Sequence, residues 1–272
     1  MTSEQSGPLG IRLESAGHAA LALTMAALGL HGLYRGDFAS VWQSVPEWFP
    51  AQTALAYLCA IVALTTGLGL LWSRTAPAAS RLLWSYLALW LLLFKGRDIL
   101  LDPLSEGPYQ SAGETAAITA GAWILYAWLA KGRVGGWLTA TVGDRGVRMA
   151  RVLYALALVA FGLSHFVYVD LTTPLIPSYL PASPTFWAWS TGAAFLAAGA
   201  AILFGIWARL AAALSALQIG LFTLLVWVPM VIAGHISDQH WTEFVMSWTI
   251  TAGAWVVADS YRGASWFITR KD

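Results

Sequence analysis

Eight stretches of roughly twenty residues are dominated by hydrophobic side chains, and shorter polar stretches separate them. A helix of about 20 apolar residues spans the hydrocarbon layer of a bilayer. The stretches lie near residues 16–34, 51–73, 79–101, 110–130, 149–169, 184–207, 209–233 and 242–260. Their apolar positions do not alternate, and an open sheet cannot cross lipid because its edges leave backbone polar groups unpaired. The pattern therefore predicts an all-α integral membrane protein with eight transmembrane helices.

The second half of the chain repeats the first. The hexapeptide Ile-Thr-Ala-Gly-Ala-Trp occurs at residues 118–123 and again at 250–255, a spacing of 132. Residues 45–51 and 176–182 share a pattern of two prolines around an aromatic residue, at a spacing of 131. This period is far longer than that of a solenoid repeat. We therefore predict two four-helix bundles arranged as a tandem repeat.

The repeat defines the expected organisation of the chain. Its parts are an N-terminal tail (1–15), a first unit (16–130), a basic Gly-containing linker (131–148), a second unit (149–260) and a C-terminal tail (261–272). Because each unit has an even number of spans, both have the same orientation, and they form a parallel repeat about an axis along the membrane normal. We expect the first stretch to be retained rather than cleaved as a signal peptide, because it has a counterpart deep inside the chain.

Composition agrees with a membrane protein and excludes several other classes. The chain is 58% hydrophobic and 11% charged, whereas soluble domains carry about 25% charged residues. The net charge of +1 gives no nucleic-acid-binding footprint. The single cysteine, Cys59, excludes an intrachain disulfide and a CxxC redox motif.

Lys and Arg residues predict the orientation. Twelve of the 15 fall on one side of an eight-helix chain, and the other three fall on or toward the opposite side. The twelve are Arg12, Arg74, Arg81, Lys131, Arg133, Arg145, Arg148, Arg151, Arg209, Arg262, Arg270 and Lys271, and the three are Arg35, Lys95 and Arg97. Because Lys and Arg accumulate in cytoplasmic loops, we predict a multi-pass protein of the cytoplasmic (inner) membrane with both termini in the cytoplasm.

Lys95, Arg97 and Asp98 interrupt an otherwise apolar stretch. Arg81 marks the inner end of this stretch, so the charges lie roughly 21–26 Å further along a helix, toward the outer boundary. One interpretation is that they extend to the outer headgroups, with Lys95 paired to Asp98. The other is a polar site between helices, because charges within a membrane are costly and typically functional. Lys95 and Arg97 would then hold a quinone carbonyl or a substrate anion.

Four of the five histidines also fall on the outer side. His31 and His165 end corresponding stretches and are candidates to face each other across the axis that relates the two units. His235 and His240 lie beside acidic residues in the last outer loop and are weak candidates for copper or zinc ligands. Solvated histidines and a proton relay are the alternatives. No haem motif and no established metal-binding motif occurs.

Trp241 and Glu243 complete the set of candidate ligand-binding residues. The set is Lys95, Arg97, Asp98, His31, His165, Trp241 and Glu243. Tryptophans at a membrane boundary commonly serve as anchors, but they also stack on flat ligands such as a quinone ring. No residue is assigned a catalytic role.

Six short motifs resemble the DoxX/DoxD-like family of small four-helix membrane proteins from bacteria and archaea. They lie at 161–165 (Phe-Gly-Leu-Ser-His), 175–181, 207–212, 228–229, 241–243 and 252–255. The resemblance covers residues 161–260 well and 29–130 loosely, which implies a tandem DoxX-like protein. In the first half, Lys-Gly-Arg-Asp at 95–98 replaces Trp-Val-Pro-Met at 227–230. The resemblance therefore does not imply that the two halves have equal functions.

Three functions are compatible with these observations. The resemblance implies a membrane subunit of a respiratory or redox assembly, such as a thiosulfate:quinone oxidoreductase, that binds quinone or a small anion near the outer leaflet. A non-catalytic scaffold or assembly protein is the second, and a small-molecule transporter or carrier is the third. The expected partners are the lipid bilayer and other subunits of a redox complex.

Overall fold

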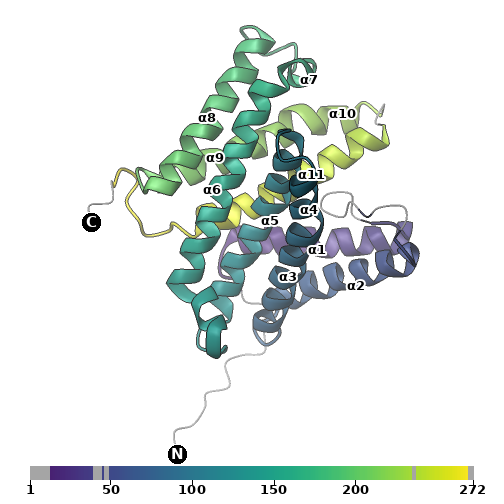
Figure 1. Ribbon diagram of the computed structural model, residues 1–272, viewed down its shortest axis with the longest axis vertical. Helices are drawn as coiled ribbons and strands as arrows, with labels where there is room; N and C mark the ends of the chain where they lie inside the picture. The colour runs from purple at the N-terminus through teal and green to yellow at the C-terminus, as the bar shows by residue number, and fades with distance from the viewer. Residues whose placement is uncertain (1–12, 39–44, 46–48, 235–236, 269–272) are drawn as a thin grey trace, which may run out of the picture.

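The computed structural model describes residues 13–38, 45, 49–234 and 237–268 (Figure 1). Within these ranges the chain folds into helices and contains no strand. The first half consists of α1 (Ala16–Arg35), α2 (Gln52–Leu71), α3 (Ala76–Trp90), the π-helical η1 (Leu91–Lys95), α4 (Gly96–Leu101) and α5 (Gly107–Leu129). The second consists of the 3-10 helix η2 (Gly136–Thr141), α6 (Gly143–Val167), α7 (Val169–Thr172), the 3-10 helix η3 (Thr173–Leu175), α8 (Pro184–Phe204), α9 (Ala208–Phe222), the π-helical η4 (Thr223–Trp227), α10 (Val228–Ile232) and α11 (Asp238–Asp259).

Six helical segments in the described part of the chain are long and apolar enough to cross a membrane. They are α1, α2, the continuous segment Ala76–Leu101, α6, α8 and the continuous segment Ala208–Ile232. Several of their leucines are more than half exposed, as lipid-facing side chains are: Leu58, Leu92, Leu156, Leu217 and Leu224. The prediction of an all-α, multi-pass membrane protein in contact with lipid is therefore confirmed at this level.

The helices α5 and α11 lie at the centre of the bundle and contact each other. Around them, α1 packs on α2 and α11, α3 on α2 and α5, α6 on α5 and α8, and α9 on α8 and α11. In Figure 1, α1 and α2 run across the view whereas α6 and α8 run steeply up it. The last helix of each half therefore packs beside the first helix of the other half, and the two halves share one core.

Capping residues explain where several helices begin and end. The hydroxyl oxygen of Ser15 accepts a hydrogen bond from the backbone N–H of His18 at the start of α1. Ser183 does the same for Phe186 at the start of α8. These bonds satisfy donors that have no partner within the helix. α1 ends at Gly36, whose φ of 68° places it in the left-handed region that glycine adopts at helix ends.

The crossing of α5 and α11 depends on Gly121 and Gly253. A Cβ atom on Gly121 would lie 2.7 Å from the Cα of Gly253, and a Cβ on Gly253 would lie 3.0 Å from the carbonyl oxygen of Ala117. The neighbouring atoms belong to the backbone, so a side chain would push the helices apart. Small residues permit this close approach, which explains why the Ala-Gly-Ala sequence occurs on both helices.

Two long helices contain one π-helical turn each. The N–H of Gly96 donates to the carbonyl of Leu91, and the N–H of Val228 donates to the carbonyl of Thr223, so each bond spans five residues. The two turns begin 132 residues apart and end at Lys95 and Trp227, which are both buried. A π-turn inserts an extra residue and rotates the helix that follows, so each turn directs its last side chain into the bundle.

Candidate functional site

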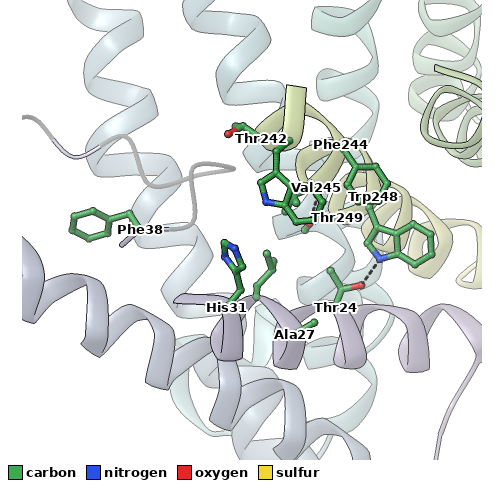
Figure 2. A pocket seen from close by; sticks show the side chains of 11 residues that line it. Thr24, Ala27, His31, Phe38, Thr242, Phe244, Val245, Trp248 and Thr249 are labelled. Atoms are coloured by element: carbon green, nitrogen blue, oxygen red, sulfur yellow. Dashed lines mark hydrogen bonds between the residues drawn. The ribbon is translucent and has the colours of Figure 1, made fainter. Parts of the chain in front are cut away.

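A cavity of about 320 Å³ lies between α1 and α11 (Figure 2). Its walls are mainly aromatic and aliphatic, with a few polar groups. The lining residues are Thr24, Ala27, Leu28, His31, Phe38, Trp241, Thr242, Phe244, Val245, Trp248 and Thr249. We call it the α1–α11 cavity. Ligand pockets of about 300–1,000 Å³ with this mixture of walls bind small, mostly apolar molecules.

The polar groups of this cavity come from both helices. The indole N–H of Trp248 donates to the hydroxyl of Thr24 at 3.0 Å, and this hydroxyl donates to the carbonyl of Ala20 at 2.7 Å (Figure 2). The rings of His31 and Trp241 lie 6.4 Å apart, centroid to centroid, at an angle of 44°. His31 is exposed, so its ring nitrogens are available to a molecule in the cavity.

A second, smaller cavity of about 120 Å³ lies on the opposite side of α11. It is lined from five helices by Gln110, Glu114, Phe161, His165, Phe195, Ile219, Phe222, Glu243, Met246, Ser247 and Ile250. We call it the carboxylate cavity. The amide N–H of Gln110 donates to a carboxylate oxygen of Glu114 at 3.2 Å. Glu114 belongs to α5 and Glu243 to α11, so each half of the chain supplies one carboxylate.

Lys95 belongs to the same polar region. Its side chain is 4% exposed, and its ammonium group donates to the hydroxyl of Ser111 on α5 at 2.7 Å. Its charge interacts with those of Glu114 and Asp98. Lys95 therefore lies between helices, as the interpretation of a polar site required. Its neighbours are a hydroxyl and carboxylates, so its positive charge is not free to bind a substrate anion.

Arg97 and Asp98 lie elsewhere. Their side chains are 50% and 42% exposed and form an ion pair with each other at 3.4 Å. Neither lines either of the two cavities. The structure thus divides the predicted charged cluster: Lys95 faces the bundle, and the other two residues are on its surface, where the first interpretation placed all three.

The two equivalent histidines line different cavities, His31 the α1–α11 cavity and His165 the carboxylate cavity. His165 donates from Nδ1 to the carbonyl oxygen of Phe161 at 2.7 Å, and its ring stacks on Phe222. The expected approach of the two histidines across the repeat axis is therefore not seen. Nδ1 of His165 is engaged, which leaves Nε2 to accept or bind a proton.

The structure gives no support to His235 and His240 as metal ligands. His235 lies outside the described residues, and His240 lies 6.3 Å from the Trp227 ring, between centroids. Among the residues that the structure describes, no group of three His, Cys, Asp or Glu side chains is arranged to hold a metal ion.

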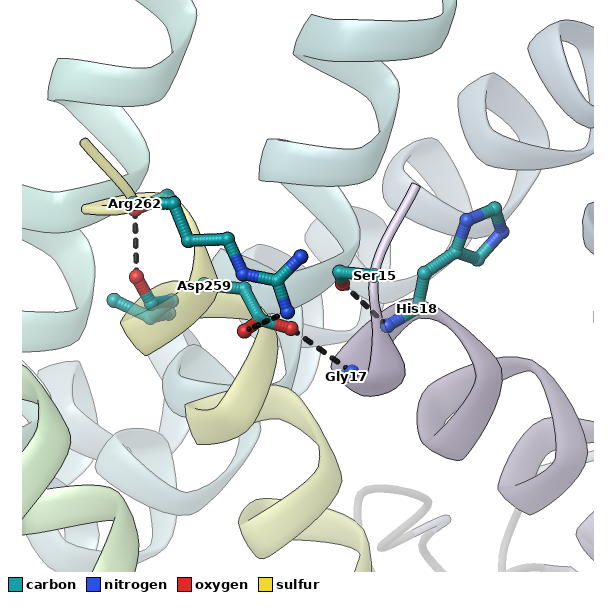
Figure 3. A network of polar contacts seen from close by, with 7 residues as sticks. Ser15, Gly17, His18, Asp259 and Arg262 are labelled. Atoms are coloured by element: carbon teal, nitrogen blue, oxygen red, sulfur yellow. Dashed lines mark hydrogen bonds and ion pairs between the residues drawn. The ribbon is translucent and has the colours of Figure 1, made fainter. Parts of the chain in front are cut away.

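The opposite end of the bundle carries a polar network that joins the first and last helices (Figure 3). The carboxylate of Asp259 accepts a hydrogen bond from the backbone N–H of Gly17 and pairs with Arg262 at 2.8 Å. His18 is fully buried, its Nδ1 accepts from the N–H of Glu14 at 3.1 Å, and its Nε2 donates to the carbonyl of Leu70 at 3.0 Å. Both ring nitrogens of His18 are therefore occupied, and the network is structural.

Burial also raises the pKa of two titratable groups outside the long helices, Glu106 and Tyr261. Both carboxylate oxygens of Glu106, just before α5, are shielded from solvent and have no hydrogen-bond partner. This burial raises the pKa of the Glu106 carboxyl. Burial likewise raises the pKa of Tyr261, and the guanidinium of Arg151, 3.6 Å above the centre of its ring, opposes that change.

Sequence reasoning missed Glu114 and Gln110 as site residues. The signal was the four-residue spacing of Glu106, Gln110 and Glu114, which places all three on one face of α5.

The comparisons with known proteins identify no relative. No family model, no curated protein and no solved structure matches this chain.

Proposed function

We propose that the chain is an eight-span membrane protein built from two DoxX-like four-helix units, with α5 and α11 as the fourth span of each. The two π-helical turns, 132 residues apart, support this division because their spacing equals that of the repeated hexapeptide. The contacts of Gly29 with Leu64 and of Gly162 with Leu196 add a further equivalent pair. α5 and α11 fall outside the six most apolar segments, and α1, α3, α6 and α9 pack against them. Their polar side chains are therefore compatible with a span that other helices shield from lipid.

We further propose that the protein binds a lipid-soluble, flat ring of the quinone class in the α1–α11 cavity, as a subunit of a respiratory or redox assembly. The observation that carries this proposal is the aromatic cavity between two helices, with His31 and Trp241 at one wall. Trp241 offers a face for stacking, and the imidazole of His31 offers a hydrogen bond to a quinone carbonyl. The small anion considered as an alternative ligand is less favoured, because Lys95 lies beside Ser111 and Glu114 rather than in an open cationic site.

Binding of a short-chain quinone to detergent-solubilised protein, followed by quenching of tryptophan fluorescence, tests the proposal. Replacing Trp241 by Leu removes the stacking face, and we expect the Kd to rise about 10-fold, the equivalent of about 1.4 kcal/mol. His31→Leu removes the hydrogen bond to the carbonyl, and we expect a similar loss. Trp137→Leu is the matched control, since Trp137 is 78% exposed on η2, far along the chain from the cavity.

Two results would count against quinone binding. The first is saturable binding that is unchanged in both Trp241→Leu and His31→Leu, which would place the ring elsewhere. The second is the absence of saturable binding in the unaltered protein. In that case a non-catalytic scaffold becomes the leading function.

A further inference from the structure

The carboxylate cavity contains more hydrogen-bond acceptors than donors. Glu114 and Glu243 bring carboxylates, and the side-chain oxygen of Gln110 is fully shielded from solvent and has no hydrogen-bond partner. The amide group of the same Gln110 already donates to Glu114. A carboxylic acid, unlike a carboxylate, carries one O–H donor. A proton held in this cavity therefore supplies the donor that the unpaired amide oxygen lacks.

The titratable groups around the carboxylates come from η1, α6, α11 and the start of α5, whereas α8 and α9 contribute only apolar side chains to the cavity. Lys95 of η1 is the nearby cation acting on Glu114, and Glu243 and Glu106 are like charges. His165 of α6 lines the same cavity, and His240 acts on Glu243 from within α11. Two carboxylates and one paired ammonium leave an excess negative charge in a region of low dielectric constant. Such charge is costly there unless a proton or a cation neutralises it.

A route to the outer end of the bundle follows one face of α5. Glu106, Gln110 and Glu114 succeed one another at intervals of four residues, so their side chains lie one above the other. Glu106 precedes the first turn of α5, and Glu114 lies two turns further in. Gln110 donates to Glu114, and neither its amide oxygen nor the Glu106 carboxyl makes a hydrogen bond. We therefore expect a proton to pass between the two carboxyl groups through water on this face.

Metal coordination is a weaker explanation of the same acceptors. No three His, Cys, Asp or Glu side chains among the described residues are arranged around a common point. The cavity of about 120 Å³ has room for water. A water molecule bridging the two carboxylates and a proton shared among these groups suits the open arrangement better than a fixed coordination shell.

We propose that the carboxylate cavity is an intramembrane proton-exchange site, in which Glu114, with Glu243 and His165 across the cavity, takes up and releases one proton. The proton moves from a hydronium ion at the outer end, by way of Glu106, to the Glu114 carboxylate, and leaves a water molecule and a neutral carboxyl group. This site lies on the face of α11 opposite the α1–α11 cavity. Glu243, Ser247 and Ile250 line one side of α11, and Trp241, Val245 and Trp248 line the other. The proposal therefore stands independently of quinone binding.

Infrared difference spectroscopy of the reconstituted protein, perfused alternately with acidic and alkaline buffer, tests this site. The carbonyl band of a protonated carboxyl group should appear in acid, disappear in alkali and shift in D₂O. Most of it should be lost in Glu114→Gln and reduced in Glu243→Gln, and Asp102→Asn, which alters an exposed carboxylate in the turn after α4, should leave it unchanged. If Glu114→Gln does not fold, protein labelled with carbon-13 in the glutamate carboxyl groups shows whether the band comes from glutamate.

Three outcomes would overturn the proposal. One is the absence of a reversible band in the unaltered protein, which would mean that no buried carboxyl exchanges a proton. Another is a band that survives both Gln substitutions, or that does not shift with the glutamate label. The third is loss of the band on adding sodium ions at constant pH, which would assign the cavity to a metal cation instead.

Discussion

The carboxylate of Asp259 accepts a 2.9 Å hydrogen bond from the backbone N–H of Gly17, a residue 242 positions earlier in the chain. Gly17 lies in the first turn of α1, where N–H groups have no partner within the helix and the helix dipole is positive. A Cβ on Gly17 would lie 2.7 Å from the backbone nitrogen of Val256, so only glycine permits α11 to approach this closely. The end of the last helix thus caps the start of the first.

Removing the Asp259 carboxylate should destabilise the protein. Asp259→Ala leaves the N–H of Gly17 without its acceptor and Arg262 without its ion-pair partner. We expect a loss of about 1–2 kcal/mol in the free energy of unfolding, as for other helix-capping residues. Thermal denaturation in detergent measures it, with Asp170→Ala, a change at an exposed carboxylate, as the control. Equal melting temperatures for the two variants would show that the contact contributes nothing.

The contact between Gly121 and Gly253 should tolerate no side chain. Gly121→Ala places a methyl group where 2.7 Å separates it from the Gly253 backbone. Overpacking of this kind costs about 1–3 kcal/mol, and Gly253→Leu should lower the yield of folded protein further. Gly135→Ala is the matched control, since Gly135 has ordinary backbone angles and open space around it. If Gly121→Ala melts at the same temperature as Gly135→Ala, close packing at this crossing is refuted.

The predicted topology can be tested at opposite ends of α6. Trp137 is 78% exposed before this helix and Tyr179 is 65% exposed after it. With both termini cytoplasmic, a membrane-impermeant thiol reagent applied to intact cells should label Tyr179→Cys and leave Trp137→Cys unmodified. The experiment requires a Cys59→Ala background, because Cys59 is the single native cysteine. Labelling of position 137 alone would show that the orientation is the reverse of the predicted one.

Glu106 should make stability depend on pH. Because burial raises the pKa of this carboxyl in the folded protein, folding favours its protonated form. This contribution is fully present below the ordinary pKa of glutamate and is lost as the pH rises through the folded value. In Glu106→Gln the side chain is uncharged at every pH, so this loss of stability does not occur. The variant should therefore melt at the same temperature as the unaltered protein in acid and at a higher temperature at neutral pH, as thermal scans across the pH range would measure. A melting difference that is constant with pH would contradict the assignment.

Hydrophobicity alone predicted the helices well. The predicted stretch at 184–207 corresponds to α8 (Pro184–Phe204), and the stretch at 16–34 corresponds to α1 (Ala16–Arg35). These boundaries are readable because Ser15, Ser183, Gly36 and Gly205 are typical capping residues. The π-turns were not predicted, because one inserted residue leaves the apolar pattern of a lipid-facing helix almost unchanged.

The site was harder to predict than the helices. Lys95 and Arg97 are two residues apart, so a helix places them on opposite faces, about 200° apart. The sequence does not say which of the two faces meets the bundle, and the structure buries Lys95 and exposes Arg97 at 50%. The π-turn that ends at Lys95 directs its side chain toward Ser111. The pairing of Glu114 with Glu243 depends on α5 and α11 meeting at the centre, which is a tertiary arrangement. The repeated Ala-Gly-Ala sequence is typical of helix contact surfaces, but it does not identify which helices meet there.

The central position of α11 has a consequence for how the protein is made. The ribosome synthesises α11 after the helices that it contacts. Until then the faces of α1, α5 and α9 that contact α11 have no partner, and the start of α1 lacks the cap that Asp259 provides. A chain that stops before residue 238 therefore leaves these helix faces uncovered. Docking of α11 against α1, α5 and α9 is therefore the step that completes this core.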